Sequence, residues 1–174
     1  MKAVGIHKVR PAVIRKDYAR AKARMILKEA GVTRPPTNLE QICDHLDVQI
    51  HYHYTDGLED SFVFLHCSVY HIVISISGRE ALDRWCIAHM LGNIVLGHCH
   101  LYTSDTMHKD ILTDSERYIL DREADIFAEE LLMPMPWMDN HKSSSINQLE
   151  KVFRVSKEVI NIRYNNLFGK KSIN

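Results

Sequence analysis

The spacing of apolar residues near the start of the chain predicts an amphipathic helix. Between Pro11 and Ala30 the apolar side chains recur at helical intervals, at Ile14, Tyr18, Ala21 and Met25. Gly31 and the Pro35-Pro36 pair then stop this helix. We expect its basic face to be solvated.

A capping box follows this first helix. In Thr37-Asn38-Leu39-Glu40, Thr37 would accept hydrogen bonds from the first turn of a short second helix, and Glu40 would reach back to the cap. The inward residues of this second helix are expected to be Leu39, Ile42, Cys43 and Leu46.

The middle of the chain carries the pattern of β-strands. Apolar and polar residues alternate over residues 48–54, so His51 and His53 should project from one face. A turn at Thr55-Asp56-Gly57 separates this strand from two β-rich runs, residues 62–65 and 69–76, which His66-Cys67-Ser68 connects. These patterns predict a small three-stranded antiparallel sheet.

Two long helices and a helical hairpin complete the pattern. The first long helix should run from Gly78 to about His98, and the second from a capping box at Thr113 to Met133, before Pro134. Residues 146–153, a tight turn and residues 157–167 then have the pattern of a helix-turn-helix.

The closing helices permit two interpretations. They could contact DNA through Lys157, Asn161 and Arg163, or they could form a hairpin that packs on the core. The chain has 22 basic and 22 acidic residues, and no basic stripe lines the last helix, so we favour the hairpin and expect no direct contact with nucleic acid.

Composition indicates an ordinary globular protein. The 174 residues suit one domain over residues 1–140, with a C-terminal helical hairpin over residues 141–174 packed on it. No apolar run is long enough for a secretory signal or a membrane helix, so we expect a cytoplasmic protein with no membrane partner. The four cysteines lack zinc-ribbon spacing and are expected to be reduced.

The two long helices carry the frame of a helical zinc peptidase. In such enzymes two histidines four residues apart bind one metal, an intervening glutamate acts on the bound water, and a third ligand comes from another helix. Here the frame spans residues 84–98 and 121–134, including the sequences A-H-x-L-G-x and E-A-x-x-F-A-x-E-L-L-M-P.

These stretches resemble the ImmA/IrrE family of zinc endopeptidases, bacterial and phage proteins that cut a helix-turn-helix repressor. The resemblance covers nearly the whole chain. It implies an α+β, zincin-like metallopeptidase fold, in which a small three-stranded antiparallel sheet packs on the active-site helix, with a helical N-terminus and a helix-turn-helix-like C-terminus.

The differences from the family pattern fall on the chemistry. The resemblance places His89 at the first metal ligand, Met90 at the catalytic glutamate, Asn93 at the second histidine, Asp121 at the third-ligand glutamate and Asp125 at the carboxylate that supports a ligand. Methionine cannot transfer a proton, an amide oxygen is a poor zinc ligand, and aspartate is one methylene shorter than glutamate. We therefore expect no intact catalytic residue and no bound cofactor.

Other side chains could rebuild a metal site, so zinc stays an alternative. Cys86 lies one turn before His89, and His100 could fold back from the following loop. His98 is nine residues beyond His89, on the opposite side of the helix unless the helix has already ended. Without a metal, His89 should be held by Asp121 or Asp125.

The expected function is regulatory. A preserved scaffold with altered chemistry predicts an inactive metallopeptidase-like protein, or pseudoenzyme, of a phage or mobile element, which acts in transcription regulation by binding a helix-turn-helix repressor or a similar protein. The alternative is an active ImmA/IrrE-type zinc endopeptidase with unusual ligands, which cleaves a transcriptional repressor.

Overall fold

The computed structural model describes residues 12–54, 61–101 and 112–169, and these residues form an α+β fold. The predicted Thr55-Asp56-Gly57 turn and the first eleven residues lie outside the described residues. The elements, in chain order, are α1 (Lys16–Glu29), α2 (Leu39–Leu46), β1 (Val48–His53), β2 (Phe62–His66), β3 (Val69–Ser75), α3 (Glu80–Val95), a 3₁₀ turn (His98–Leu101), α4 (Asp114–Leu132), α5 (Met135–Asn140), α6 (Ile146–Phe153) and α7 (Lys157–Phe168).

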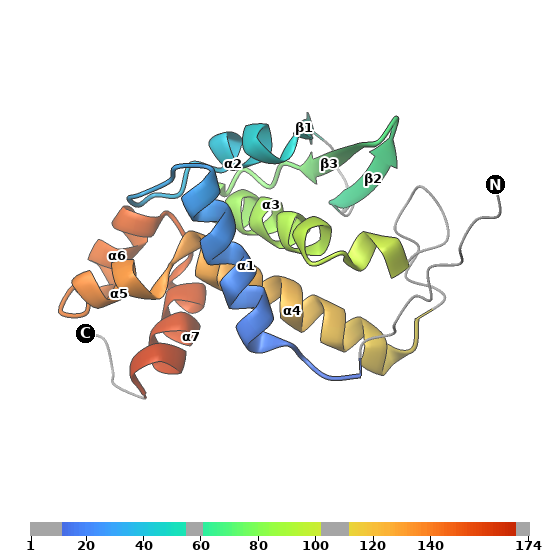
Figure 1. Ribbon diagram of the computed structural model, residues 1–174. Helices are drawn as coiled ribbons and strands as arrows, with labels where there is room; N and C mark the ends of the chain where they lie inside the picture. The colour runs from blue at the N-terminus through green and yellow to red at the C-terminus, as the bar shows by residue number, and fades with distance from the viewer. Residues whose placement is uncertain (1–11, 55–60, 102–111, 170–174) are drawn as a thin grey trace.

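The elements form layers around α3 (Figure 1). The sheet and α2 lie on one side of α3, and α4 lies on the other side with α1 packed against it. Helices α5, α6 and α7 gather at one end of the molecule, beyond the C-terminal end of α4. No helix in the described part of the chain is long and apolar enough to cross a bilayer.

The sheet is mixed, which differs from the all-antiparallel sheet expected. Its strand order is β1-β3-β2. The β2–β3 pair is antiparallel, as predicted, and its tight turn places Cys67 and Ser68 at positive φ. However, β1 pairs with β3 in parallel. The alternation of residues fixes which face of a strand is buried, but it carries no information about which strand lies beside it.

One face of the sheet packs on the helices and the other faces outward. Val63, Ile72 and Ile74 are almost completely buried on the helix side. His51 and His53 are exposed on the other side, as the alternation predicts. The sheet therefore contributes one apolar face to the core and leaves a histidine-bearing face uncovered.

A glycine sets the distance between α3 and α4. A side chain at Gly92 would place its Cβ 3.1 Å from both the Cα and the carbonyl oxygen of Ala124, closer than most real contacts. The two helix backbones therefore approach closely at this point. This approach brings the side chains of α3 within hydrogen-bond range of carboxylates on α4.

The buried face of α1 is not the one that its apolar spacing predicts. Tyr18 and Met25 are at least 36% exposed, whereas the buried residues are Ala19, Ala23, Ile26 and Leu27. The basic residues are also not merely solvated, because Arg15 and Arg24 form ion pairs with Glu123 and Glu130. This helix carries two apolar stripes that are offset from each other. The stripe of Ala19, Ala23, Ile26 and Leu27 is the buried one, and the ion pairs of Arg15 and Arg24 with α4 form in the same arrangement.

The cap of α2 is shifted by one residue from the prediction. Asn38, not Thr37, is the N-cap, and its side chain accepts a hydrogen bond from the Gln41 backbone. Thr37 is buried and donates to the Leu131 carbonyl at 2.8 Å. The predicted Thr113 capping box of α4 is present.

Helices α6 and α7 contribute Leu149, Phe153 and Ile160 to the hydrophobic core. Arg163 is completely buried on α7, so it is not available to contact DNA. Its guanidinium donates to the Met133 carbonyl and to the Glu130 carboxylate, and it lies 3.8 Å from Glu129. Burial raises the pKa of Glu129, although the Arg163 charge opposes this shift. Arg163 thus ties α7 to the C-terminal end of α4.

Replacing Arg163 should destabilise the protein strongly. The variant Arg163→Met leaves two buried glutamates without this cation, and breaking such a buried pair costs about 3–5 kcal/mol. Chemical denaturation should therefore show a clearly lower free energy of unfolding. The control Asn161→Ala changes an exposed residue of the same helix and should stay within about 0.5 kcal/mol of wild type. Equal stabilities for the two variants would contradict this assignment.

Candidate functional site

His89, at the first metal-ligand position of the zinc-peptidase pattern, forms a hydrogen bond with an aspartate. His89 lies on α3, and its Nδ1 is 3.1 Å from Asp125 Oδ1 on α4. The other carboxylate oxygen of Asp125 accepts from Arg122 at 2.9 Å. Burial raises the pKa of Asp125, but the contacts with His89 and Arg122 outweigh it and the pKa is lowered overall. Asp125 is one of the two partners expected for His89, and its contact with Nδ1 leaves Nε2 as the ring nitrogen that a metal could use.

The next position, the place of the catalytic glutamate, is apolar. Met90 is partly buried and packs against the hydrophobic core. A thioether is a weak acceptor and has no proton to transfer. The side chain at this position therefore contributes packing.

The second metal-ligand position is part of a buried hydrogen-bond network. Asn93 is 3% exposed, and its Oδ1 lies 2.9 Å from Nδ1 of His98. His98 is itself 1% exposed, and its Nε2 lies 3.0 Å from Glu123 Oε2. The Asn93 amide nitrogen also donates weakly to the His89 carbonyl at 3.4 Å. The amide oxygen at this position thus faces a histidine ring.

The network ends on an arginine from the beginning of the described chain. Glu123 is completely buried, and Arg15 binds it with its backbone N–H at 2.7 Å and with Nε and Nη2 at 2.8 and 2.6 Å. Burial raises the pKa of Glu123, but the hydrogen bonds with Arg15 and His98 lower it by more. The pKa is therefore lowered overall, which favours the ionised carboxylate. We call Arg15, Glu123, His98 and Asn93 the Glu123 network.

The network forms because α3 ends earlier than predicted. The sequence predicts a helix to about His98, but α3 ends at Val95, and Gly97 follows with a φ of +75°. A 3₁₀ turn beginning at His98 then turns the chain back toward α4. His98 therefore reaches the side of α3 that carries Asn93, because the helical spacing that would have pointed it away no longer applies.

Burial controls the protonation of the residues around this turn. It lowers the pKa of His98, while the hydrogen bond with Glu123 opposes this shift. It also raises the pKa of the Cys86 thiol, and that of Cys99 to about 12. Cys86 lies on α3, and its raised pKa favours the protonated thiol in the absence of a metal.

Of the remaining predicted ligands, only Asp121 has a side chain among the described residues. Asp121 lies one turn before Asp125 on α4 and is partly buried. His100 belongs to the 3₁₀ turn, but its side chain lies outside the described residues. Among the residues that the structure describes, no group of three His, Cys, Asp or Glu side chains is arranged to hold an ion. The donor atoms at positions 89, 93 and 121 therefore do not fit the usual zinc site.

Sequence reasoning missed Glu123 and Arg15. A signal for Glu123 is present, because it falls on the apolar stripe of α4 between Leu120 and Phe127, which are both buried. A charge on such a stripe requires a buried partner. Nothing in the sequence indicates that this partner is Arg15, which is 108 residues away.

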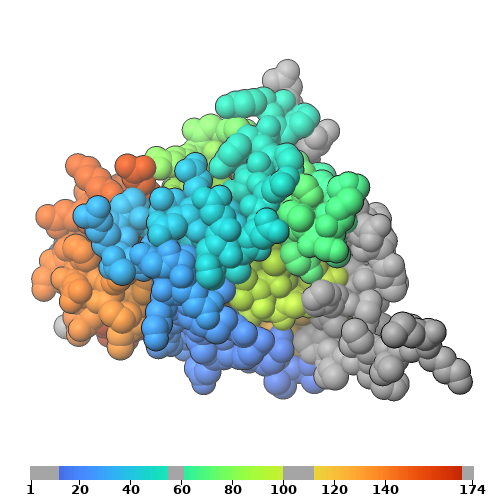
Figure 2. Space-filling view, turned by 45° about the horizontal axis from the view of Figure 1, so that its top comes forward, coloured from blue at the N-terminus to red at the C-terminus, as the bar shows by residue number. Residues whose placement is uncertain are grey.

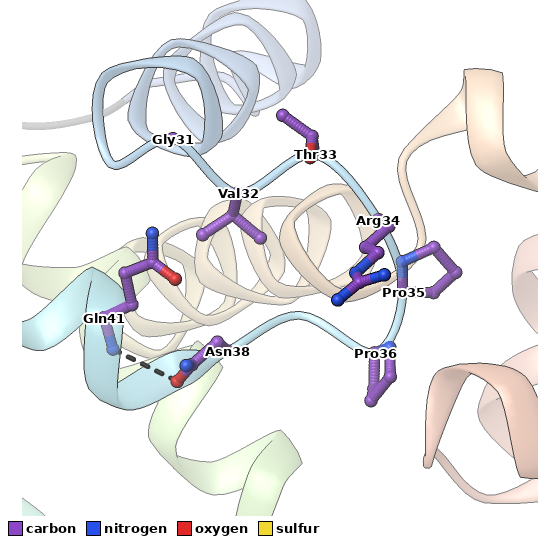
Figure 3. A pocket seen from close by; sticks show the side chains of 8 residues that line it. All are labelled: Gly31, Val32, Thr33, Arg34, Pro35, Pro36, Asn38 and Gln41. Atoms are coloured by element: carbon purple, nitrogen blue, oxygen red, sulfur yellow. Dashed lines mark hydrogen bonds between the residues drawn. The ribbon is translucent and has the colours of Figure 1, made fainter.

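A separate pocket lies in the connection between α1 and α2 (Figure 3). It has a volume of about 330 Å³ and is lined by residues 31–36 together with Asn38 and Gln41. None of the residues of the zinc-peptidase pattern lines it. The pocket is therefore not the counterpart of a peptidase active site.

Removing the Glu123 carboxylate should destabilise the fold. Glu123→Ala leaves His98 and the guanidinium of Arg15 without their partner. We expect a loss of roughly 3 kcal/mol in unfolding free energy, at the low end for a buried pair because Arg15 is partly exposed. The exposed acid of the first turn of α2 is the control, and Glu40→Ala should cost less than about 1 kcal/mol by denaturation. A Glu123→Ala protein as stable as the control would contradict the structural role of this network.

Comparison with solved structures supports the fold. A Mycobacterium tuberculosis transcriptional regulator has a TM-score of 0.59 and is 18% identical in sequence. The alignment covers 92% of this chain and 50% of that protein, so this chain spans about half its length. At this level of identity the similarity concerns the fold alone. No curated protein sequence gives a significant match.

Comparison with family models identifies the domain. The model described as IrrE N-terminal-like domain (Peptidase_M78) matches residues 43–165. This range includes the sheet, α3, α4 and nearly all of the closing hairpin. Since the match covers more than half of the chain, the protein belongs to the family of IrrE N-terminal-like domains.

Proposed function

We propose that this chain is a catalytically inactive regulatory protein with a metallopeptidase fold, which binds a protein partner without cutting it. The observation that carries the proposal is the hydrogen bonding of Asn93, the residue that the resemblance places at the second metal ligand. There the Asn93 amide oxygen lies against His98, which in turn contacts the buried Glu123. A hydrogen-bonded amide thus stands at the position where the resemblance implies a metal-binding imidazole.

The residue beside His89 supports the same proposal. A general base acting on water is typically worth about 10²–10⁴-fold in rate. Met90 offers no proton acceptor for this step and packs against the core. Hydrolysis by the route of zinc peptidases would therefore lack both its base and one of its ligands.

The retained scaffold indicates how a partner would bind. Both outer strands of the sheet, β1 and β2, have an unpaired edge within the described sheet. An extended segment of a partner can add to such an edge as a further strand, with main-chain hydrogen bonds giving affinity. The resemblance to ImmA/IrrE proteins makes a helix-turn-helix repressor the partner that we propose.

Binding without cleavage is the expected behaviour. A purified helix-turn-helix repressor incubated with this chain should give a complex by size-exclusion chromatography. Intact-mass spectrometry should show no fragments, with or without added zinc, because Met90 cannot act as the base that a zinc peptidase uses to activate water. Efficient cleavage that stops on addition of a chelator would instead establish the alternative, a zinc endopeptidase with unusual ligands.

Restoring the family residues should restore metal binding. The triple variant Met90→Glu, Asn93→His, Asp121→Glu adds a second imidazole to that of His89 on α3 and a longer carboxylate on α4. It should therefore bind about one equivalent of zinc more than the wild type after gel filtration, measured by elemental analysis. The control Met90→Glu restores no ligand and should remain near the wild-type level. If the triple variant gains no zinc, the hydrogen bonds of the Glu123 network prevent the imidazole introduced at position 93 from binding a metal. The three substitutions alone would then not account for the loss of the site.

A further inference from the structure

Two histidines lie edge to edge on the outer side of the sheet, with one ring nitrogen of each pointing at the other. In the parallel pairing of β1 with β3, His51 lies opposite Val73 and Gln49 opposite His71, so the two histidines occupy diagonal positions on one face. Nε2 of His51 is 2.9 Å from Nδ1 of His71, and their ring centroids are 5.2 Å apart. In Figure 2 the strands of the sheet, in cyan to green, reach the surface with no helix lying over them.

The separation of these two nitrogens suits two ligands of one ion. With metal–nitrogen bonds of about 2.0–2.1 Å, nitrogens 2.9 Å apart subtend about 90° at the metal, as neighbouring ligands do. Because the two nitrogens point at each other in this structure, each ring must turn by about 45° so that both lone pairs meet at the ion. Opening to the tetrahedral angle would separate the nitrogens by only a few tenths of an ångström more. Without a metal, one nitrogen must donate a proton to the other. A neutral imidazole can carry that proton on its other nitrogen, which frees both facing lone pairs.

The neighbouring side chains favour the same chemistry. Phe64 on β2 stacks on the His71 ring, with centroids 4.7 Å apart and an interplanar angle of 8°, which restricts the orientation of that ring. The centroid of the His66 ring is 6.1 Å from that of His71, and Nε2 of His66 is 3.4 Å from the Cys67 sulfur. Imidazole and thiol groups are the donors that zinc, copper and nickel prefer.

We propose that His51 and His71 form a two-histidine chelate for one divalent transition-metal ion of the zinc, copper and nickel class. Within the described residues no third donor converges on the pair, so water would complete the coordination. The site lies on the outer face of the sheet, whereas α3, which carries His89, packs against the other face. It is therefore separate from the zinc-peptidase pattern and does not depend on the proposed function.

Calorimetric titration of the full chain with Zn²⁺, after treatment with a chelator and gel filtration, tests the proposal. Wild-type protein should bind about one equivalent. His51→Gln and His71→Gln should each weaken binding at least tenfold, because each removes one of two nitrogens. His53→Gln is the matched control, since it changes an exposed histidine on the same strand and face, and it should bind as wild type. Circular dichroism should show that all three variants are folded.

Each contrary result overturns the proposal in a different way. No binding by wild type, or undiminished binding by both His51→Gln and His71→Gln, means that the pair does not chelate. Loss of binding in Cys67→Ser with retention in those two variants would place the ion at the β2–β3 turn instead. Loss confined to His89→Gln would place it at the peptidase position, and that outcome would also contradict the proposed function.

Discussion

The carboxylate of Glu123 joins three parts of the molecule that are distant in sequence. It binds Arg15 just before α1 and His98 in the turn after α3, while its own helix, α4, packs against both α1 and α3. A completely buried carboxylate without these donors would carry a large desolvation cost. The positions of α1 and of the turn after α3 are therefore coupled to this one charge, and so is the environment of Asn93.

Hydrogen bonds and ion pairs link α3 and the turn after it to α4 at the positions that the resemblance assigns to metal ligands. Zinc stabilises its site by drawing together ligands from separate helices. Here the cross-links between helices are hydrogen bonds and ion pairs: His89 with Asp125, Asn93 with His98, and His98 with Glu123. The close approach of α3 and α4 at Gly92 brings these short side chains within reach of one another.

A second group of charges performs a comparable role at the other end of α4. Arg163 from α7 and Arg24 from α1 both contact Glu130, whose side chain is almost completely buried. One long helix thus presents three buried glutamates, Glu123, Glu129 and Glu130, each of which forms an ion pair with an arginine from outside the helix. The closing hairpin is consequently part of the same packed unit, and the arginine that could have been a DNA contact is a structural residue.

The sequence by itself determined the types of most elements, the capping box of α4 and the frame of the two long helices, because these depend on local periodicity and on motifs within one helix. It did not predict α5 or the 3₁₀ turn at His98. It also placed Asp125 among the two partners expected for His89. Only the tertiary structure decided the parallel pairing of β1 with β3, the buried face of α1 and the return of His98 to Asn93. These features depend on which distant segments of the chain come into contact, and on the need of each buried charge for a partner. The spacing of residues along one segment predicts neither.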